Sequence, residues 1–201
     1  MCPVTSASAI KLLELSRDDG GYVVESYGVE PLPENTVVEQ NIVDVAAVAE
    51  AIKRLQASTQ FKSKAAAVAV AGSAVITKTI EVPASLKENQ IEEQLLMDAD
   101  QYIPYPLDEV ALDFQVLAAT ARSEDMVDVL IAACRQEHIE SRQAALELSG
   151  LNPEVIDIEA HCVQRAIALD LELFTRDPAL GVPDVLAILD IGADMTTLSV
   201  V

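Results

Sequence analysis

The residues best suited to do chemistry lie near the end of the chain, where an apolar stretch runs into a short turn. Asp190 ends that stretch, Gly192 lies in the turn, and Thr196 and Thr197 follow it. Glycine lets backbone amides approach a phosphate closely, hydroxyl groups donate hydrogen bonds to it, and a carboxylate holds hydrated Mg²⁺. This spacing suits a polyphosphate site. It also suits an ordinary β-hairpin with a polar turn, and from spacing alone the hairpin is favoured.

The elements that must position these residues alternate between strands and helices. Strands are predicted where β-branched residues gather or alternate, at 10–14, 22–29, 66–71, 74–82, 110–118, 126–134, 154–158, 185–190 and 196–201. Helices are predicted after Asp44, from Ser85 to about Gln101, from Gln136 to Ser149 and from about Ala160 to Phe174. Hairpins mixed with helices predict a mixed α/β fold, in which helices cover the faces of layered sheets.

The sequence pattern changes at Pro83, and this change divides the chain. We expect a first part of the main domain at 1–82, an inserted α+β subdomain at 83–157, and a return to the main domain at 158–201. Local signals mark some boundaries. Ser85 and Glu88 have the spacing of a capping box, and Gly150 is placed to end a helix.

Composition excludes several classes of function. The chain has 201 residues with 33 acidic and 13 basic side chains, a formal charge of −20, which opposes binding to nucleic acid or to an anionic membrane. No apolar run approaches the ~20 residues of a membrane helix, so no direct membrane insertion is expected. The three cysteines, Cys2, Cys134 and Cys162, are far apart and odd in number, which favours a reduced, cytoplasmic chain.

The Asp190 motif also resembles a known phosphate-binding loop. The apolar strand followed by Asp-x-Gly-x-x-x-Thr-Thr resembles the second phosphate loop of the actin-like ATPase superfamily. Further stretches, in order along the whole chain, resemble one family of that superfamily, the type IV pilus assembly proteins PilM. They are Lys11–Leu15, Tyr27–Pro33, Asn41–Asp44, Ala67–Lys78, Asp98–Pro106 and Leu189–Ala193.

This resemblance implies an actin-like, ribonuclease-H-like domain with an inserted subdomain. In such proteins ATP and Mg²⁺ lie in a cleft between two large domains, and the second large domain is missing from this sequence, so we expect a fragment. The resemblance also implies a cytoplasmic scaffold that binds the N-terminal tail of a PilN-like inner-membrane protein and other pilus assembly components. Such a protein would lie beside the inner membrane through its partner.

The first phosphate loop departs from the family pattern. The stretch Thr5–Lys11 matches that loop and offers Ser6, Ser8 and Lys11 as phosphate ligands, although a solvated turn and an exposed lysine explain them equally well. Val4 occupies the position of the family's aspartate, and the preceding Pro3 cannot donate to a sheet, so we expect the strand before the loop to be absent. Asp190 is then the one candidate metal ligand, and we expect weak or no nucleotide binding and no enzymatic activity.

A second candidate site lies where two tyrosines stand between two prolines. Such a segment is rigid and apolar, which suits a short peptide lying in a groove. In the family the PilN groove lies between the main domain and the insert, whereas tyrosines that fill that interface would give the same sequence. The candidate partner-binding residues are Tyr102, Ile103, Pro104, Tyr105, Ser73 and Val75.

Two rival functions remain at this point. An ATPase or phosphotransferase of the same superfamily would need a carboxylate near the first phosphate loop, and Val4 opposes it. A cell-division scaffold resembling FtsA shares the fold, but the stretch Gln101–Pro106 favours the pilus family.

Overall fold

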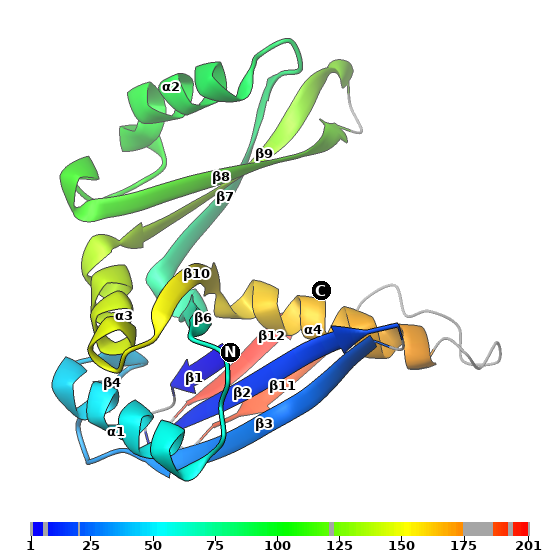
Figure 1. The fold of residues 1–201 in the computed structure, drawn as a ribbon. Helices are drawn as coiled ribbons and strands as arrows, with labels where there is room; N and C mark the ends of the chain where they lie inside the picture. Colours follow the sequence, from blue (N-terminus) through cyan, green and yellow to red (C-terminus); the bar gives the residue numbers. More distant parts are fainter. Residues whose placement is uncertain are drawn as a thin grey trace. The chain divides into compact units, whose positions relative to one another are not determined.

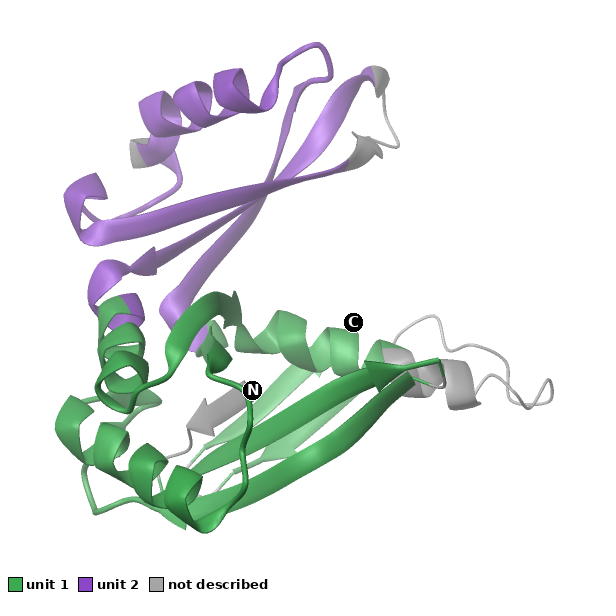
Figure 2. Cartoon of the chain, viewed as in Figure 1, with its two compact units in different colours: residues 1–72, 140–201 green, residues 73–139 purple. Residues whose placement is uncertain are grey.

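The computed structural model describes residues 2–5, 8–19, 21–120, 123–174, 187–192 and 195–200, and the chain divides into two compact units (Figure 2). Unit 1 comprises residues 1–72 and 140–201, and unit 2 comprises Ser73–Ile139. The inserted unit therefore begins and ends earlier than the predicted 83–157. Strand pairing explains the shift, because the strand before Pro83 pairs within unit 2, whereas the strand before Glu159 pairs within unit 1.

Unit 1 is built on short sheets and hairpins (Figure 1). An antiparallel sheet has the order β1-β2-β3, and a parallel pair joins β6 to β10, with β1 lying beside β6. Two separate hairpins pair β4 with β5 and β11 with β12. The bounds are β1 (Cys2–Thr5), β2 (Ala9–Asp18), β3 (Gly21–Pro31), β4 (Val37–Val38), β5 (Asn41–Ile42), β6 (Ala65–Val70), β10 (Asn152–Ile158), β11 (Ala187–Ile191) and β12 (Thr196–Val200).

Helix α1 (Val45–Ser58) covers the inner face of β2 and β3. The predicted cap is confirmed, because the Asp44 carboxylate accepts a hydrogen bond from the Ala47 N–H at 2.9 Å. Ile10 and Leu12 of β2 are buried with Ile52 and Leu55 of the helix. The apolar residues at alternate positions of β2 therefore pack against the apolar stripe of α1. Helix α4 (Glu159–Phe174) contacts β6 and β10.

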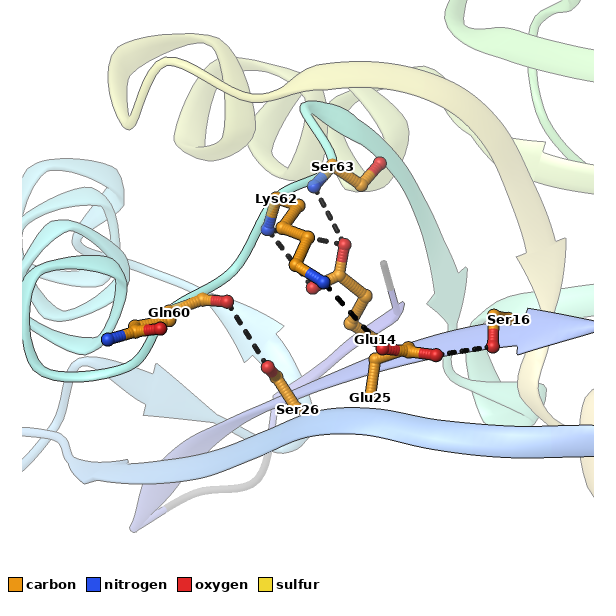
Figure 3. Close-up of polar contacts among 7 residues, drawn as sticks. All are labelled: Glu14, Ser16, Glu25, Ser26, Gln60, Lys62 and Ser63. Atoms are coloured by element: carbon orange, nitrogen blue, oxygen red, sulfur yellow. Dashed lines mark hydrogen bonds and ion pairs between the residues drawn. The ribbon is translucent and has the colours of Figure 1, made fainter.

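A buried carboxylate fastens the segment between α1 and β6 to the sheet (Figure 3). Glu14 of β2 is only 6% exposed, and its oxygens accept hydrogen bonds from the Lys62 N–H at 3.1 and 3.3 Å and from the Ser63 N–H at 2.7 Å. Nearby, Glu25 accepts a hydrogen bond from the Ser16 hydroxyl at 2.6 Å and pairs with the Lys62 ammonium at 3.8 Å. The hydrogen bond from the Lys62 N–H is the largest cause that lowers the pKa of Glu14. The Ser63 N–H lowers it further, whereas burial raises it.

Unit 2 is a three-stranded antiparallel sheet with the order β7-β9-β8 (Figure 1). Its core lies between one face of that sheet and helix α2, where Ile91 and Leu95 are buried with Val82, Val129 and Ile131. The bounds are β7 (Val75–Pro83), α2 (Glu88–Asp98), β8 (Val110–Thr120), β9 (Ser123–Arg135) and the start of α3 (Gln136–Leu148), with 3-10 turns at Ala99–Gln101 and Leu107–Glu109.

Two local predictions are corrected. The strand before the first loop is present as β1, in which Pro3 lies opposite Leu12, and the position is tolerated because, among the described strands, β1 is hydrogen-bonded to β2 alone. Helix α2 begins at Glu88 instead of Ser85, because a turn follows Pro83, and the Gln90 side chain accepts from the Lys87 N–H at 3.0 Å in place of the expected capping box.

Other predicted features are confirmed. β2 and β3 form the expected hairpin, and α3 ends before Gly150, whose φ of +81° is the left-handed conformation that such a position requires. No helix in the described part of the chain has the length and apolar character needed to cross a membrane.

Candidate functional site

The β11–β12 hairpin carries the second predicted phosphate loop. Asp190 lies opposite Thr197, so both side chains lie on one face, whereas Thr196 pairs with Ile191 on the other face. The Gly192 N–H donates to the Met195 carbonyl at 2.9 Å, and a Cβ at Gly192 would lie 2.8 Å from that oxygen. The glycine is therefore required by the turn, and the hairpin brings Asp190 and Thr197 together without Thr196.

A second carboxylate, which the sequence did not single out, is close enough to Asp190 for their charges to interact. Glu159 is the first residue of α4 and follows β10 directly. Burial and then the charge of Asp190 raise the pKa of Glu159, while the charge of Arg142 lowers it. The charges of Glu159 and Asp190 therefore interact, and the two residues are called the acidic pair below. The signal for Glu159 was its place where a strand ends and a helix begins, the point at which α/β proteins gather ligand-binding groups.

The acidic pair lies at the carboxyl edge of the parallel strands. β6 and β10 run in the same direction, with Val70 opposite Ile158, so the residues that follow each strand emerge together. A Cβ at Gly72 would lie 3.7 Å from the Ala160 Cβ, which confirms that the two segments meet there.

Arg142 supplies a buried positive charge to this part of unit 1. Its side chain is 3% exposed, its Nε donates to the Ala69 carbonyl at 2.9 Å, and its Nη2 donates to the Gln40 carbonyl at 2.9 Å. Gln40 has a φ of +64°, and its neighbour Glu39 a φ of +49°. The arginine thus holds a turn of two non-glycine residues in the left-handed region, a conformation that costs about 1–2 kcal/mol per residue.

Ser8 and Lys11 are the candidate residues of the first predicted phosphate loop that the structure describes. Ser8 is exposed, and its carbonyl accepts from the Leu32 N–H at 2.9 Å. Lys11 is exposed within β2, opposite Val4 of β1 and Val29 of β3. Among the described residues, no hydrogen bond or ion pair joins Ser8 or Lys11 to the β11–β12 hairpin. Ser6 lies outside the described residues.

The acidic pair fits hydrated Mg²⁺ better than a fully protein-bound metal. The described residues contain no group of three or more His, Cys, Asp or Glu side chains that could hold a metal ion. Mg²⁺ keeps several waters and needs only one or two carboxylates beside phosphate oxygens, and Asp190 and Glu159 supply that number.

In unit 2 the predicted peptide-binding residues divide between core and surface. Ile103 is buried with Ala99, Val110 and Ala133, so its side chain packs in the core of unit 2, and its role in partner binding stays a prediction. Tyr102 packs against the same core, and the Lys78 ammonium lies 4.8 Å from its ring centroid.

The remaining predicted positions are more accessible. Pro104 and Tyr105 are exposed, Tyr105 by 43%. Ser73 is exposed just before β7, and Val75 begins that strand opposite Cys134. Val75 alternates with Ile76, which packs in the core, so Val75 lies on the sheet face away from α2. Of the predicted partner-binding residues, Pro104, Tyr105 and Ser73 are therefore exposed, and Tyr102 and Val75 are half-buried.

Solved structures of two kinds are similar to this chain. A PilM–PilN type IV pilus biogenesis complex contains a chain with 31% sequence identity and a TM-score of 0.72, covering 96% of this chain and 55% of that one. The cytoplasmic domain of EpsL, an inner-membrane component of the type II secretion system of Vibrio cholerae, has 16% identity and a TM-score of 0.50, covering 79% of this chain and 56% of that one. The EpsL match shows the fold alone. The chain thus spans a little over half the length of each.

The family comparison covers nearly the whole sequence. The model of the type IV pilus assembly protein PilM matches residues 5–201, which include both units and both predicted phosphate loops. Together with the mixed α/β fold, this confirms the predicted actin-like class, and the chain belongs to the PilM family of type IV pilus assembly proteins.

Proposed function

We propose that this protein is a scaffold component of a type IV pilus system and binds the N-terminal cytoplasmic tail of a PilN-like inner-membrane protein. The observation that carries the proposal is the match over 96% of the chain to a protein solved as a PilM–PilN complex. The scaffold acts in the cytoplasm, lies beside the inner membrane through that tail, and contacts other assembly components. The pilus family is favoured over the FtsA-like and phosphotransferase alternatives by the same match.

The charge of unit 2 supports a basic peptide as the ligand. Ser73–Ile139 holds 13 acidic and 4 basic side chains, a formal charge of −9. Such a field attracts a short basic tail and speeds its encounter with the surface. Tyr105, held between Pro104 and Pro106, offers a ring that loses little conformational freedom on binding.

Calorimetric titration of a synthetic PilN-type tail peptide tests this proposal. We expect Tyr105→Ala to weaken binding about tenfold or more, as for an aromatic anchor. Met97→Ala is the matched control, because Met97 is an 82% exposed apolar side chain of the same unit, and it should leave the affinity unchanged. A folded wild-type protein that gives no binding heat at any salt concentration would contradict the proposal.

We also propose that this chain binds MgATP weakly or not at all and does not hydrolyse it. Asp190 and Glu159 would hold Mg²⁺ and the Gly192 turn would face the phosphates, but Val4 supplies no carboxylate from the first loop. Mg²⁺-dependent phosphate release by the pure chain would refute this. Where a fluorescent ATP analogue binds measurably, Thr197→Ala should weaken it and Thr196→Ala should not, because only Thr197 shares a face with Asp190.

A further inference from the structure

Lys78 of unit 2 places its ammonium 4.8 Å from the centroid of the Tyr102 ring. Side chains of β7 alternate between the two faces of the sheet, and Ile76 and Ile80 pack in the cores of unit 2, so Lys78 lies on that same face. Tyr102 is half-buried, whereas Lys78 is exposed. The lysine can therefore leave the ring without disturbing the core.

The Tyr102 ring itself is held in place by the unit. It packs against both apolar clusters of unit 2, and the Tyr102 N–H donates to the Ala99 carbonyl at 2.9 Å. The next residue, Ile103, is buried, and its N–H donates to the same carbonyl at 2.8 Å. A ring that is fixed before a ligand arrives loses little freedom on binding, so Tyr102 offers a preformed face for a cation.

The pairing of Lys78 with a ring is unusual in such an acidic unit. Unit 2 holds 13 acidic and 4 basic side chains, and Arg135 pairs with the Glu137 carboxylate at 2.9 Å. Within the part of the chain that the structure describes, no ion pair joins Lys78 to a carboxylate. A lysine on an exposed ring is held weakly, and a guanidinium stacks on an aromatic face better than an ammonium does.

We propose that Lys78 competes with the bound tail for the Tyr102 ring, and that a basic side chain of the tail takes the place of the lysine there. The inference rests on the proposed function, because the basic tail is the ligand, and it adds the chemistry of one subsite. Two cations repel each other on one ring, so binding moves Lys78 into water. The lysine therefore lowers the affinity for the tail.

Two substitutions of Lys78 with opposite expected effects test the proposal in calorimetric titrations with the synthetic PilN-type tail peptide. Lys78→Thr removes the competitor and suits a strand, whereas Lys78→Arg keeps the charge and stacks more strongly. We expect Lys78→Thr to tighten binding about two- to fivefold and Lys78→Arg to weaken it by a similar factor.

Lys87→Thr is the matched control for the loss of charge. Lys87 is an exposed residue of the same unit at the N-cap of α2, a position that threonine suits. Because an exposed charge away from the ring acts only through the screened field, this variant should change the affinity by less than about twofold. An equal gain from Lys78→Thr and Lys87→Thr would assign the effect to net charge and overturn the proposal.

The ring current of Tyr102 gives a direct readout of where Lys78 lies. In the free protein the ε-methylene protons of Lys78 should resonate upfield of those of other lysines, and their signal is assigned by its loss in Lys78→Thr. Saturation with the tail peptide should return this signal to the position of a solvated lysine. In the Tyr102→Leu background, Lys78→Thr and Lys78→Arg should bind the tail equally.

The outcomes separate this inference from the function on which it rests. Weaker binding by Lys78→Thr, or an upfield lysine signal that persists in the complex, would overturn the inference and leave the scaffold function intact. A folded wild-type protein that binds no tail would contradict the proposed function and this inference with it.

Discussion

Replacing Glu14 tests the view that one buried carboxylate fastens the α1–β6 segment to the sheet. Its two oxygens receive three N–H contacts from Lys62 and Ser63, and Glu14→Ala would leave both amides without that acceptor (Figure 3). Hydrogen bonds to a charged group contribute about 1.5–3 kcal/mol each, and the cost of burying the carboxylate offsets part of that sum. We expect Glu14→Ala to lose about 2–4 kcal/mol of unfolding free energy at pH 7, and Glu14→Gln about half as much.

The pH dependence of the stability difference tests the role of Glu14 more directly than its size at pH 7. Because the pKa of Glu14 is lowered in the folded protein, its stabilising contribution is fully present above its unfolded pKa of 4.5. The contribution is then lost as the pH falls through the lower folded pKa. The stability difference between the wild-type protein and Glu14→Gln should therefore stay constant from pH 7 to about 5 and shrink below pH 4.5.

Urea unfolding followed by circular dichroism at several pH values measures this difference. Dilute protein is needed, since the isoelectric point is about 4.2 and the chain loses its net charge in the relevant range. All other carboxylates titrate in both proteins, so their effects cancel in the comparison. A difference that is the same at pH 7 and pH 3.5 would refute the assignment of a charged, hydrogen-bonded Glu14.

Three further outcomes follow from the packing and charges of unit 1. Gly28→Ala should cost about 1–3 kcal/mol in urea unfolding, because its Cβ would lie 2.6 Å from Leu55 Cδ1 and this buried side chain must shift; an unchanged midpoint would contradict this packing. Arg142→Met should cost about 2–4 kcal/mol, since it removes the arginine's hydrogen bonds to the Ala69 and Gln40 carbonyls and its charge from the surroundings of Glu159, whereas Arg142→Lys should recover part of the loss. Glu159→Gln should raise stability at pH 7, because a raised pKa means that the folded protein disfavours the charged form; the gain should fade on acidification, and a lower midpoint at pH 7 would count against the pair with Asp190.

Periodicity and turn chemistry were enough to predict most elements of this fold. The Asp44 cap, the α1 stripe and the β2–β3 hairpin depend on residues close in sequence, and all three are confirmed. The boundary of the inserted unit was placed too late because it depends on pairing between distant strands. β7 pairs with β9 and β10 pairs with β6, and neither choice is visible in the local pattern.

The same limit applies to the candidate sites. The pattern around Tyr102 and Tyr105 does not tell which side chains face the core, because that depends on packing between elements far apart in the sequence, and the structure buries Ile103 and exposes Tyr105. Thr196 and Thr197 were grouped because they are adjacent, although adjacent residues in a strand face opposite ways.

Glu159 and Arg142 show how charges that are far apart in sequence become one electrostatic group. Arg142 lies on α3, Glu159 begins α4 and Asp190 lies in β11, and the pKa of Glu159 responds to both of the other charges. The guanidinium of Arg142 is also fixed by the carbonyls of Ala69 and Gln40. A cation bound by the acidic pair would compete with Arg142 for the same carboxylate charge. The charge of Arg142 favours the ionised form of Glu159, and it thereby opposes the rise in the pKa of Glu159 that burial and Asp190 cause.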